Sequence, residues 1–407
     1  MLLTNALLPD GRTVDVEVAD GLVCAVRPAG SSAPSGRLST DLAGYLLVES
    51  LVEPHAHLDK VFTADRAANP LGTLAGAMSG YEAVLLASDA ADIRRRARRA
   101  LLILVGHGVT AVRTHLGCGR LLGLRAVEAF AQVREELAPF VDVQVVAHVG
   151  GPALDVPWSR HARILRDALA AGADVVGGNP FSEAAPDEAM DACLQVAVDA
   201  GRPVDLHVDE TTDPSVLTLR RLAALAAQAG VPVTASHAVS LGAVAPALAD
   251  EIAAEVAAAG VSVVTLPATN LHLQGRGAHP APRGLTAIDA LERAGVTVAA
   301  GGDNARDPFN PVGRLDPLET ASLLVTAGHR SVDQAWRMTV PASRAVMGLP
   351  EAGPVVGRRA DLLAVRAQSL GDAVALAPAD RLVLRAGHVI SRTTTTSSGP
   401  LHEAGLA

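Results

Sequence analysis

The stretch Val52-Glu-Pro-His-Ala-His-Leu-Asp-Lys60 closes an apolar run that begins at residue 45. It places His55 and His57 two residues apart at the end of that run. If the run is a strand, its side-chain period of two directs both imidazoles to the same side. Two converging neutral imidazoles form half of a site for a first-row metal ion. An isolated pair of this kind is more often one surface and one core histidine, so the case depends on further ligands elsewhere in the chain.

From residue 46 onward the sequence repeats a short apolar strand, a loop and an alanine-rich helix. The pattern predicts strands at 46–55, 110–116, 141–148, 173–177, 203–208, 231–237, 261–266 and 296–301. Helical periodicity fills the intervals, at 92–105, 122–137, 162–171, 187–199, 217–228, 243–259 and 285–293. Eight such units predict an α/β fold, the (β/α)8 TIM barrel. An open doubly wound sheet is the competing fold, but no glycine-rich phosphate loop follows the first strand.

Both ends of the chain carry strand-like alternation outside this repeat. Val14, Val16 and Val18 alternate with acidic residues, as in a half-buried strand. After helices expected at 318–327 and 332–347, alternation returns at 355–365 and 381–391. We therefore expect residues 1–50 and 350–395 to form one small β-sandwich domain, and residues 51–349 to form the barrel. The segments 28–37 and 393–407 are expected to be irregular.

Composition limits the classes of function. The 407 residues are 49% hydrophobic and 2% aromatic, which suits a large aliphatic core and argues against stacking platforms for nucleic acids. The net charge is −9, and the arginine run 94–99 reads as the solvated face of a helix. We therefore expect neither a nucleic-acid nor a membrane partner. Three widely spaced cysteines and the absence of a signal-peptide pattern predict a cytoplasmic protein, which we expect to be a homo-oligomer.

Ionisable residues concentrate at the ends of the predicted strands. Barrel enzymes place their reactive groups at the C-terminal ends of the barrel strands, so this distribution tests the fold and the site together. Chance burial of single histidines does not produce such a pattern. The residues concerned are His55, His57, His115, His148, His207, Glu210, His237, Asp303 and Asn304.

These residues can be assigned roles by chemical need. A hydrolytic metal site requires three or four nitrogen or carboxylate ligands and an open position for water. Glu210 would carry a proton from the water to the substrate nitrogen, and His237 would hydrogen-bond the nucleophile or the developing tetrahedral oxygen. Together with Asp303, they form the predicted catalytic set. The predicted metal ligands are His55, His57, His207 and Asp303.

Each assignment has a simpler alternative. His237 could be a satisfied core histidine, and Glu210 could cap the following helix, a role that Asp209 would fill as well. Asp303 could bind the backbone of the turn before Pro308. The joint occurrence of the whole set at strand ends favours the functional interpretation.

Several motifs resemble those of the amidohydrolase superfamily, and the chain is most similar to its cytosine deaminase branch. The resemblance implies a (β/α)8 barrel with a β-sandwich built from both termini, and one divalent ion, Zn²⁺ or Fe²⁺. It also implies hydrolytic deamination, in which metal-bound hydroxide attacks the ring carbon that bears the amino group. No lysine follows the fourth strand, which favours one metal over two. The matching motifs are Glu53-Pro-His-Ala-His-Leu-Asp59, Val112-Arg-Thr-His115, His207-Val-Asp-Glu210, Ala235-Ser-His237, Asn270-Leu-His-Leu-Gln-Gly-Arg276 and Asp307-Pro-Phe-Asn-Pro311.

The departures from that branch concern the substrate. Its Phe-Pro-Gln-Glu-Gly stretch after strand three is His148-Val-Gly-Gly-Pro152 here, so the glutamine that reads a pyrimidine amide edge is lost. The His-Asp-Asp motif on strand eight is Gly302-Asp303-Asn304. We therefore expect the metal chemistry to be unaltered and the residues that recognise the substrate to differ. The predicted substrate-binding residues are Gln274, Asn304, His148 and Phe309, with Phe62 and Trp158 as further aromatic candidates.

The leading hypothesis is a metal-dependent hydrolytic deaminase of a small nitrogen heterocycle, such as a cytosine-like pyrimidine, a triazine, a pterin or a related amidine. The alternative is a hydrolase of the same mechanism that splits a cyclic amide or releases an alkylamine from a ring. A catalytically silent binding protein is disfavoured because Glu210 is present.

Overall fold

The computed structural model describes residues 1–31, 38–67, 69–119, 123–150, 158–396 and 398. The chain divides into two compact units. The smaller unit comprises Met1–Leu51, Leu104–Thr110 and Glu351–Ala407, and the larger comprises Val52–Ile103 and Ala111–Pro350. Among the described residues, no helix combines the length and apolar character needed to cross a membrane.

The smaller unit is built on one sheet that contains strands from both ends of the chain. The strand order is β16-β15-β14-β5-β1-β2-β3, with β4 paired to β1. The two ends of the chain meet where β5 pairs antiparallel with β14, in a register that places Leu46 opposite Val365. The expectation of strands from both termini in a sheet separate from the barrel is thus confirmed. Its strands are β1 (Leu2–Leu7), β2 (Thr13–Ala19), β3 (Leu22–Pro28), β4 (Ser39–Asp41), β5 (Leu46–Glu49), β14 (Leu362–Val365), β15 (Arg381–Arg385) and β16 (His388–Thr393).

The larger unit is organised around a second eight-stranded sheet, ordered β13-β12-β11-β10-β9-β8-β7-β6. Neighbouring strands from β7 through β13 pair in parallel. A parallel bridge between Ala56 and Asp303 joins the first strand to the segment after the last one. The sheet is therefore a nearly closed barrel, as predicted. Its strands are β6 (Leu51–Ala56), β7 (Val109–Gly117), β8 (Asp142–Val149), β9 (Val175–Gly178), β10 (Val204–Val208), β11 (Val233–His237), β12 (Ser262–Thr265) and β13 (Val298–Ala300).

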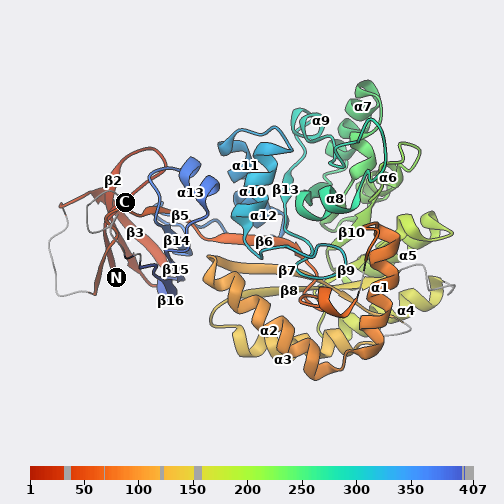
Figure 1. The fold of residues 1–407 in the computed structure, drawn as a ribbon, viewed down its shortest axis with the longest axis horizontal. Helices are drawn as coiled ribbons and strands as arrows, with labels where there is room; N and C mark the ends of the chain where they lie inside the picture. Colours follow the sequence, from red (N-terminus) through yellow and green to blue (C-terminus); the bar gives the residue numbers. More distant parts are fainter. Residues whose placement is uncertain (32–37, 68, 120–122, 151–157, 397, 399–407) are drawn as a thin grey trace. The chain divides into compact units, whose positions relative to one another are not determined.

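Helices cover the outside of this barrel. In Figure 1, α2 and α3 lie on one side of strands β7 and β8, and α10, α11 and α12 lie on the other side. Most of the helices fall where the sequence predicts them. They are α2 (Ala90–Gly106), α3 (Arg125–Leu137), α4 (Trp158–Ala170), α5 (Pro186–Ala200), α6 (Thr218–Ala229), α7 (Pro246–Ala258), α9 (Ile288–Arg293), α10 (Pro317–Thr326), α11 (Val332–Thr339) and α12 (Pro341–Val346).

Some elements differ from the prediction. The strand expected over 46–55 is two strands in different sheets, separated at Ser50, whose hydroxyl lies 2.6 Å from Thr110 Oγ1. The helix expected over 332–347 is broken at Pro341, which has no N–H to continue the helical ladder. Three helices were not predicted: α1 (Leu74–Ala87), α8 (Pro267–Leu273) and α13 (Leu370–Leu376). Apolar residues surround α1 instead of forming one stripe, so it lacks the amphipathic pattern.

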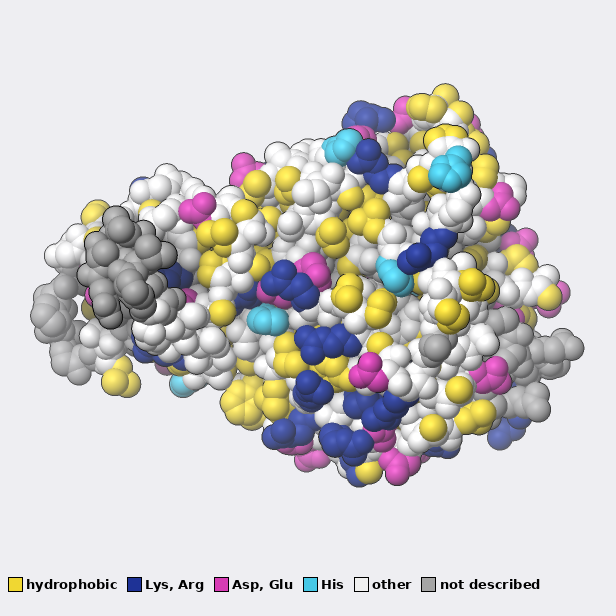
Figure 2. Space-filling view, viewed as in Figure 1, with side chains coloured by type: hydrophobic (Ala, Val, Ile, Leu, Met, Phe, Trp, Pro, Cys, Tyr) yellow, Lys and Arg dark blue, Asp and Glu magenta, His cyan; other side chains and the backbone are white. Residues whose placement is uncertain are grey.

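The arginine run on α2 is only partly solvated. Arg95, Arg98 and Arg99 lie on the surface, where Figure 2 shows basic side chains gathered. Arg96 is buried, contrary to the prediction. Its guanidinium donates to the Asp59 carbonyl at 2.6 Å and to the Val61 carbonyl at 3.0 Å. It therefore fixes the loop that follows β6.

Asp92 supports this arrangement, and its removal tests it. Burial works to raise the pKa of Asp92, but hydrogen bonds from Arg66 and Arg96 outweigh it and lower the pKa to about 2. Ionised Asp92 thus stabilises the fold above its unfolded pKa of about 3.9, and this contribution is lost as the pH falls towards 2. We predict that Asp92→Asn lowers the urea midpoint at pH 6 and flattens the decline of that midpoint between pH 5 and pH 3.

Trp158 and Trp336, the two tryptophans of the chain, both lie in the larger unit, so tryptophan fluorescence reports its unfolding. The matched control is Asp250→Asn, which removes an exposed ion pair with Arg293. The prediction would be contradicted if the urea midpoint of Asp92→Asn fell between pH 5 and pH 3 as steeply as that of the parent protein.

Candidate metal centre and active site

The four predicted metal ligands lie together at the C-terminal ends of the barrel strands. His57 Nε2 is 3.1 Å from His207 Nε2 and 3.4 Å from Asp303 Oδ1. His55 Nε2 is 3.7 Å from the same Asp303 oxygen. The side chains come from β6, from β10 and from the segment after β13, and all four residues are buried.

The hydrogen bonding and the pKa values of these four side chains fit the binding of a divalent cation. Among the described residues, His55 Nε2 and Asp303 Oδ1 have no hydrogen-bond partner, although both atoms are buried. Burial holds the pKa values of His55, His57 and His207 well below the ordinary value, so the imidazoles are neutral and able to coordinate. Burial also raises the pKa of Asp303 to about 7, the expected result for a carboxylate without a cation. A metal ion would compensate both the unpaired lone pairs and the buried charge.

Other groups of neighbouring histidine and aspartate side chains are weaker candidates for a metal site. His55, His115 and Asp205 lie within coordinating distance of one another. Asp205, however, already accepts hydrogen bonds from Arg113 at 2.9 Å and from the Ser236 hydroxyl at 2.7 Å. Two further groupings contain only histidines, so they would leave the charge of the ion uncompensated. The set that includes Asp303 has an uncommitted carboxylate oxygen.

A buried hydrogen-bond chain sets the orientation of His55. Ser236 Oγ donates to Asp205, so it accepts from the Nδ1–H group of His55 across 2.9 Å. The proton on Nδ1 leaves the lone pair on Nε2 free for a cation. Arg113 completes this hydrogen-bond chain by pairing with Asp205. Ser236 and Asp205 were not predicted as site residues, although both lie on barrel strands that end at the site.

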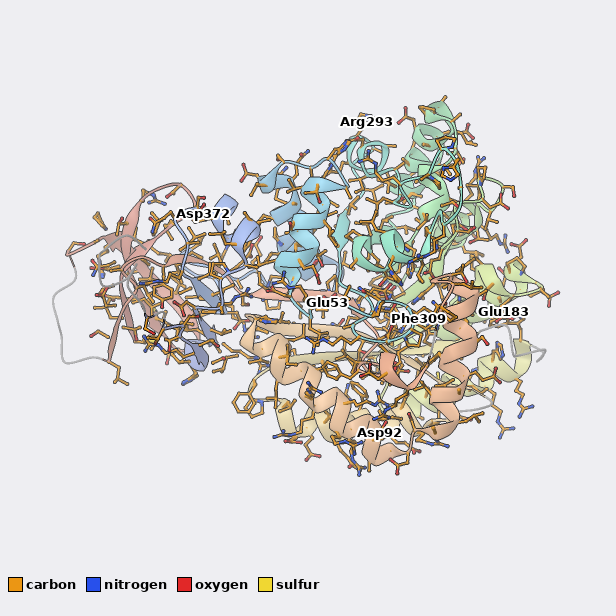
Figure 3. All side chains as sticks on the ribbon, in the orientation of Figure 1. Glu53, Asp92, Glu183, Arg293, Phe309 and Asp372 are labelled. Carbon is orange, nitrogen blue, oxygen red and sulfur yellow. The ribbon has the colours of Figure 1, made fainter. Side chains whose placement is uncertain are left out.

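Glu53 also supports the predicted metal ligands. It belongs to the motif Glu53–Asp59, but its role could not be predicted from the sequence. Its carboxyl group accepts from the Gly302 N–H at 3.0 and 3.1 Å and from the His55 N–H at 3.2 Å. Burial raises the pKa of Glu53 to about 8. A side chain at Gly302 would bring its Cβ within 3.0 Å of this carboxyl group. The glycine therefore allows Glu53, labelled in Figure 3, to tie β6 to the segment that carries Asp303.

Glu210 lines a cavity at this site, and its neighbour Asp209 performs the capping role. Asp209 adopts a left-handed φ of 52° and accepts hydrogen bonds from the N–H groups of Thr218 and Leu219 at 2.8 and 3.1 Å. This caps α6 without Glu210. Burial, and then the nearby Asp303, raise the pKa of Glu210 well above its ordinary value. A carboxyl group in this state can hold a proton near neutral pH.

His237 is oriented by the unpredicted helix α8. The Asn270 amide donates to His237 Nδ1 at 3.1 Å, so the ring proton sits on Nε2. His237 Nδ1 is 3.7 Å from Glu210 Oε1. His237 and Asp303 have φ values of 73° and 61°, a left-handed backbone that is costly outside glycine and occurs preferentially at functional sites.

A cavity of about 810 Å³ opens onto this cluster. The four predicted substrate-binding residues all line it. Gln274 donates its amide N–H to the Glu210 carbonyl at 3.0 Å, which leaves its Oε1 atom available as an acceptor. Asn304 donates to Asp307 at 2.8 Å, so this part of its amide is already engaged. Gly151 and Pro152, from the stretch that replaces the family glutamine, lie outside the described residues.

The opposite wall of the cavity comes from α1, which the sequence analysis missed. Figure 3 shows Phe309 beside this helix, and its ring centroid is 6.1 Å from that of Tyr81. Two of the predicted aromatic candidates lie elsewhere: Phe62 packs under Arg99, and Trp158 packs on His161. Phe181 lines the cavity instead. The α1 residues on the wall include Leu74, Ala75, Met78, Ser79, Tyr81, Glu82 and Leu85.

A parallel eight-stranded barrel with buried imidazoles and a carboxylate at its strand ends defines a metal-dependent hydrolase. The comparison with family models agrees, because the model of the Amidohydrolase family matches residues 63–393. The chain belongs to this family, and it is a metal-dependent hydrolase that acts on C–N bonds.

Individual relatives narrow the comparison. The chain is 34% identical to a pterin deaminase of Rhizobium rhizogenes over 389 residues, which cover 93% of this chain and 88% of the relative. Its fold matches the crystal structure of 5-methylcytosine deaminase from Klebsiella pneumoniae liganded with phosphonocytosine, with a TM-score of 0.89, 28% identity and coverage of 98% and 100% of the two chains. It also matches N-isopropylammelide isopropylaminohydrolase from Burkholderia multivorans, with a TM-score of 0.83, 29% identity and coverage of 96% and 98%.

Asp303 offers a direct test of the ligand set. We predict that Asp303→Asn, which preserves shape and removes the charge, abolishes retention of a divalent ion after dialysis, as measured by elemental analysis. The control is His161→Ala, which removes a buried histidine outside the cluster and should leave metal content unchanged. Full metal occupancy in a folded Asp303→Asn protein would contradict the assignment.

The hydrogen bonds that join His55 to Ser236 and Ser236 to Asp205 give a second prediction. Ser236→Ala removes the acceptor for His55 Nδ1–H, and we expect a loss of about 10- to 100-fold in metal affinity, typical of partners behind a ligand. Competition with a chromophoric chelator measures this change. Ser240→Ala serves as the control, because the Ser240 hydroxyl donates to the Val216 carbonyl and takes no part in the hydrogen bonds behind His55. Equal affinities in the two variants would show that Ser236 does not orient the ligand.

Proposed function

We propose that the protein is a hydrolytic deaminase of an amino-bearing nitrogen heterocycle, with a pterin as the preferred class. The observation that carries this proposal is that Glu210 and His237 line the same cavity as His57, His207 and Asp303. The pterin preference is supported by the 34% identical pterin deaminase and by a cavity of about 810 Å³, ample for a substituted bicyclic ring.

One divalent ion, Zn²⁺ or Fe²⁺, fits the ligands His55, His57, His207 and Asp303. Such an ion, when bound, supplies the Lewis acidity that makes water nucleophilic near neutral pH. The described β9 supports a single ion, because it ends in Gly177 and Gly178. A Cβ at Gly177 would lie 2.4 Å from the Val146 side chain and 2.9 Å from the Asp205 carbonyl, so a bridging lysine there has no room.

Glu210 and His237 divide the proton transfers. Glu210 takes a proton from the attacking water and passes it to the ring nitrogen beside the carbon under attack. The second proton of the water goes to the amino nitrogen, which leaves as ammonia while the ring carbon becomes a carbonyl. The raised pKa of the Glu210 carboxyl group suits it to hold that proton between the two steps. His237 donates its Nε2–H to the oxygen on which negative charge develops.

Gln274 and Phe309 are the residues proposed to recognise the substrate ring. The free Oε1 atom of Gln274 can accept a ring N–H, and the face of Phe309 can pack on a flat heterocycle. A site built to hydrogen-bond one edge rejects rings that leave its polar groups unpaired. Because the glutamine of the cytosine deaminases is replaced after strand three, cytosine itself is not the proposed substrate.

The experiment is an ammonia-release screen with the metal-reconstituted protein over aminopterins, aminopyrimidines and aminotriazines. The proposal predicts the highest kcat/KM with an aminopterin. Absence of ammonia release from every ring by a protein that retains its metal would contradict it.

Release of an alkylamine from a triazine ring is the second candidate. The N-isopropylammelide hydrolase from Burkholderia multivorans, 29% identical over 96% of this chain, supports it. Mass spectrometry of products from N-alkylated aminotriazines separates the two candidates, because one releases an alkylamine and the other releases ammonia.

Glu210 has a specific prediction. Glu210→Gln keeps the shape of the side chain but cannot carry the proton, so we expect metal content to be retained and kcat to fall by about 10²- to 10⁴-fold. The control is Glu188→Gln, an exposed glutamate in the first turn of α5. An unchanged kcat in Glu210→Gln would remove this residue from the mechanism.

A further inference from the structure

Lys60 occupies an unusual position in this chain. Of the 34 lysine and arginine residues, Lys60 alone is a lysine. It is 7% exposed, and it lines the cavity at the active site. Every other cationic position uses the planar guanidinium of arginine, whereas the position inside the cavity uses a compact ammonium with three donors.

The ammonium group lies against two aromatic rings, and its charge also acts on His57, Glu210 and Asp303 nearby. Lys60 Nζ lies 3.9 Å from the centroid of the Phe309 ring and 5.0 Å from that of Tyr81. Within the described parts of the chain, no hydrogen bond or ion pair involves this nitrogen. Ring faces attract a cation but accept no conventional hydrogen bond, so the donors of Lys60 remain available to a ligand.

The backbone on both sides of Lys60 is held in place. Arg96 donates to the carbonyl groups of Asp59 and Val61 at 2.6 and 3.0 Å. Asp59 Oδ2 in turn accepts from the Tyr81 hydroxyl and from the Gly117 N–H, each at 3.0 Å. This network positions the ammonium before any ligand enters, which lowers the entropic cost of binding.

The charges along the cavity define what Lys60 can bind. Among the described lining residues it is the sole lysine or arginine, and four carboxyl groups line the same space. These acceptors suit the N–H groups of an amidine, but an electron-rich oxygen on the same substrate would be repelled by them. Lys60 offers such an oxygen a charged donor. The four acidic residues are Asp59, Glu82, Glu210 and Asp303.

We propose that Lys60 is a substrate-binding residue that pairs with a negatively charged or strongly polarised oxygen of the heterocycle. That oxygen is either a ring oxo group conjugated with the carbon under attack or a carboxylate carried by the ring. This inference rests on the proposed function, since it names the substrate feature that the same site selects. In a merely structural role, Lys60 would offset the nearby carboxylates and would not respond to a ligand.

The single lysine allows a direct test by NMR. Incorporation of lysine labelled with ¹³C at Cε gives one lysine signal from the metal-loaded protein. We expect saturable shifts of this signal on addition of formate, of pteridine-2,4-dione and of its 6-carboxylate. A response to both pteridines identifies the ring oxygen, and a response to the carboxylate alone identifies that substituent. A signal unmoved by formate and by both pteridines overturns the proposal.

The formate arm separates this inference from the proposed function. A shift with formate but no binding of either pteridine would contradict the pterin proposal and leave the oxyanion site standing. Lys60→Met should retain metal and lower kcat/KM by about 10- to 100-fold for oxygen-bearing substrates, with partial rescue in Lys60→Arg. Arg99→Met, which removes a cation over Phe62 outside the cavity, is the matched control. An equal kcat/KM in Lys60→Met and Arg99→Met would also overturn the proposal.

Discussion

The site depends on the backbone pairing that brings the first and last parts of the barrel together. The Asp303 N–H donates to the His55 carbonyl at 2.9 Å, and the His57 N–H donates to the Asp303 carbonyl at 3.2 Å. These bonds join residues almost 250 positions apart, and Glu53 reinforces them through Gly302. Two histidines and a carboxylate are therefore placed on one rim by the same hydrogen bonds that close the barrel.

Burial then determines the chemistry of that rim. The imidazoles are neutral because desolvation disfavours their charged form, and the same desolvation raises the pKa values of Glu210 and Asp303. Neutral imidazoles can bind a cation, and a protonatable Glu210 can transfer a proton. The Asp205–Ser236 chain selects the His55 tautomer, and Asn270 selects that of His237. Coordination and proton donation are thus assigned to different rings by their hydrogen-bond partners.

Much of this arrangement could be predicted from the sequence. Barrel strands have short apolar runs, and their ends carry the ionisable residues, so His207, His237 and Asp303 were identifiable without coordinates. The cavity wall was not predicted, because α1 is apolar on all sides and gives no periodic signal. Ser236 and Arg96 were missed as supporting groups because only the tertiary structure shows what they contact. The break at Ser50 was missed because one apolar run supplies strands to two sheets.

The central claim is that distant side chains converge on one cation, and X-ray absorption spectroscopy of the metal-reconstituted protein tests it most directly. The account predicts about one Zn²⁺ or Fe²⁺ per chain, with a ligand shell of nitrogen and oxygen only and with the multiple-scattering pattern of several imidazoles. Failure to retain an ion, or a shell that contains sulfur, would contradict it.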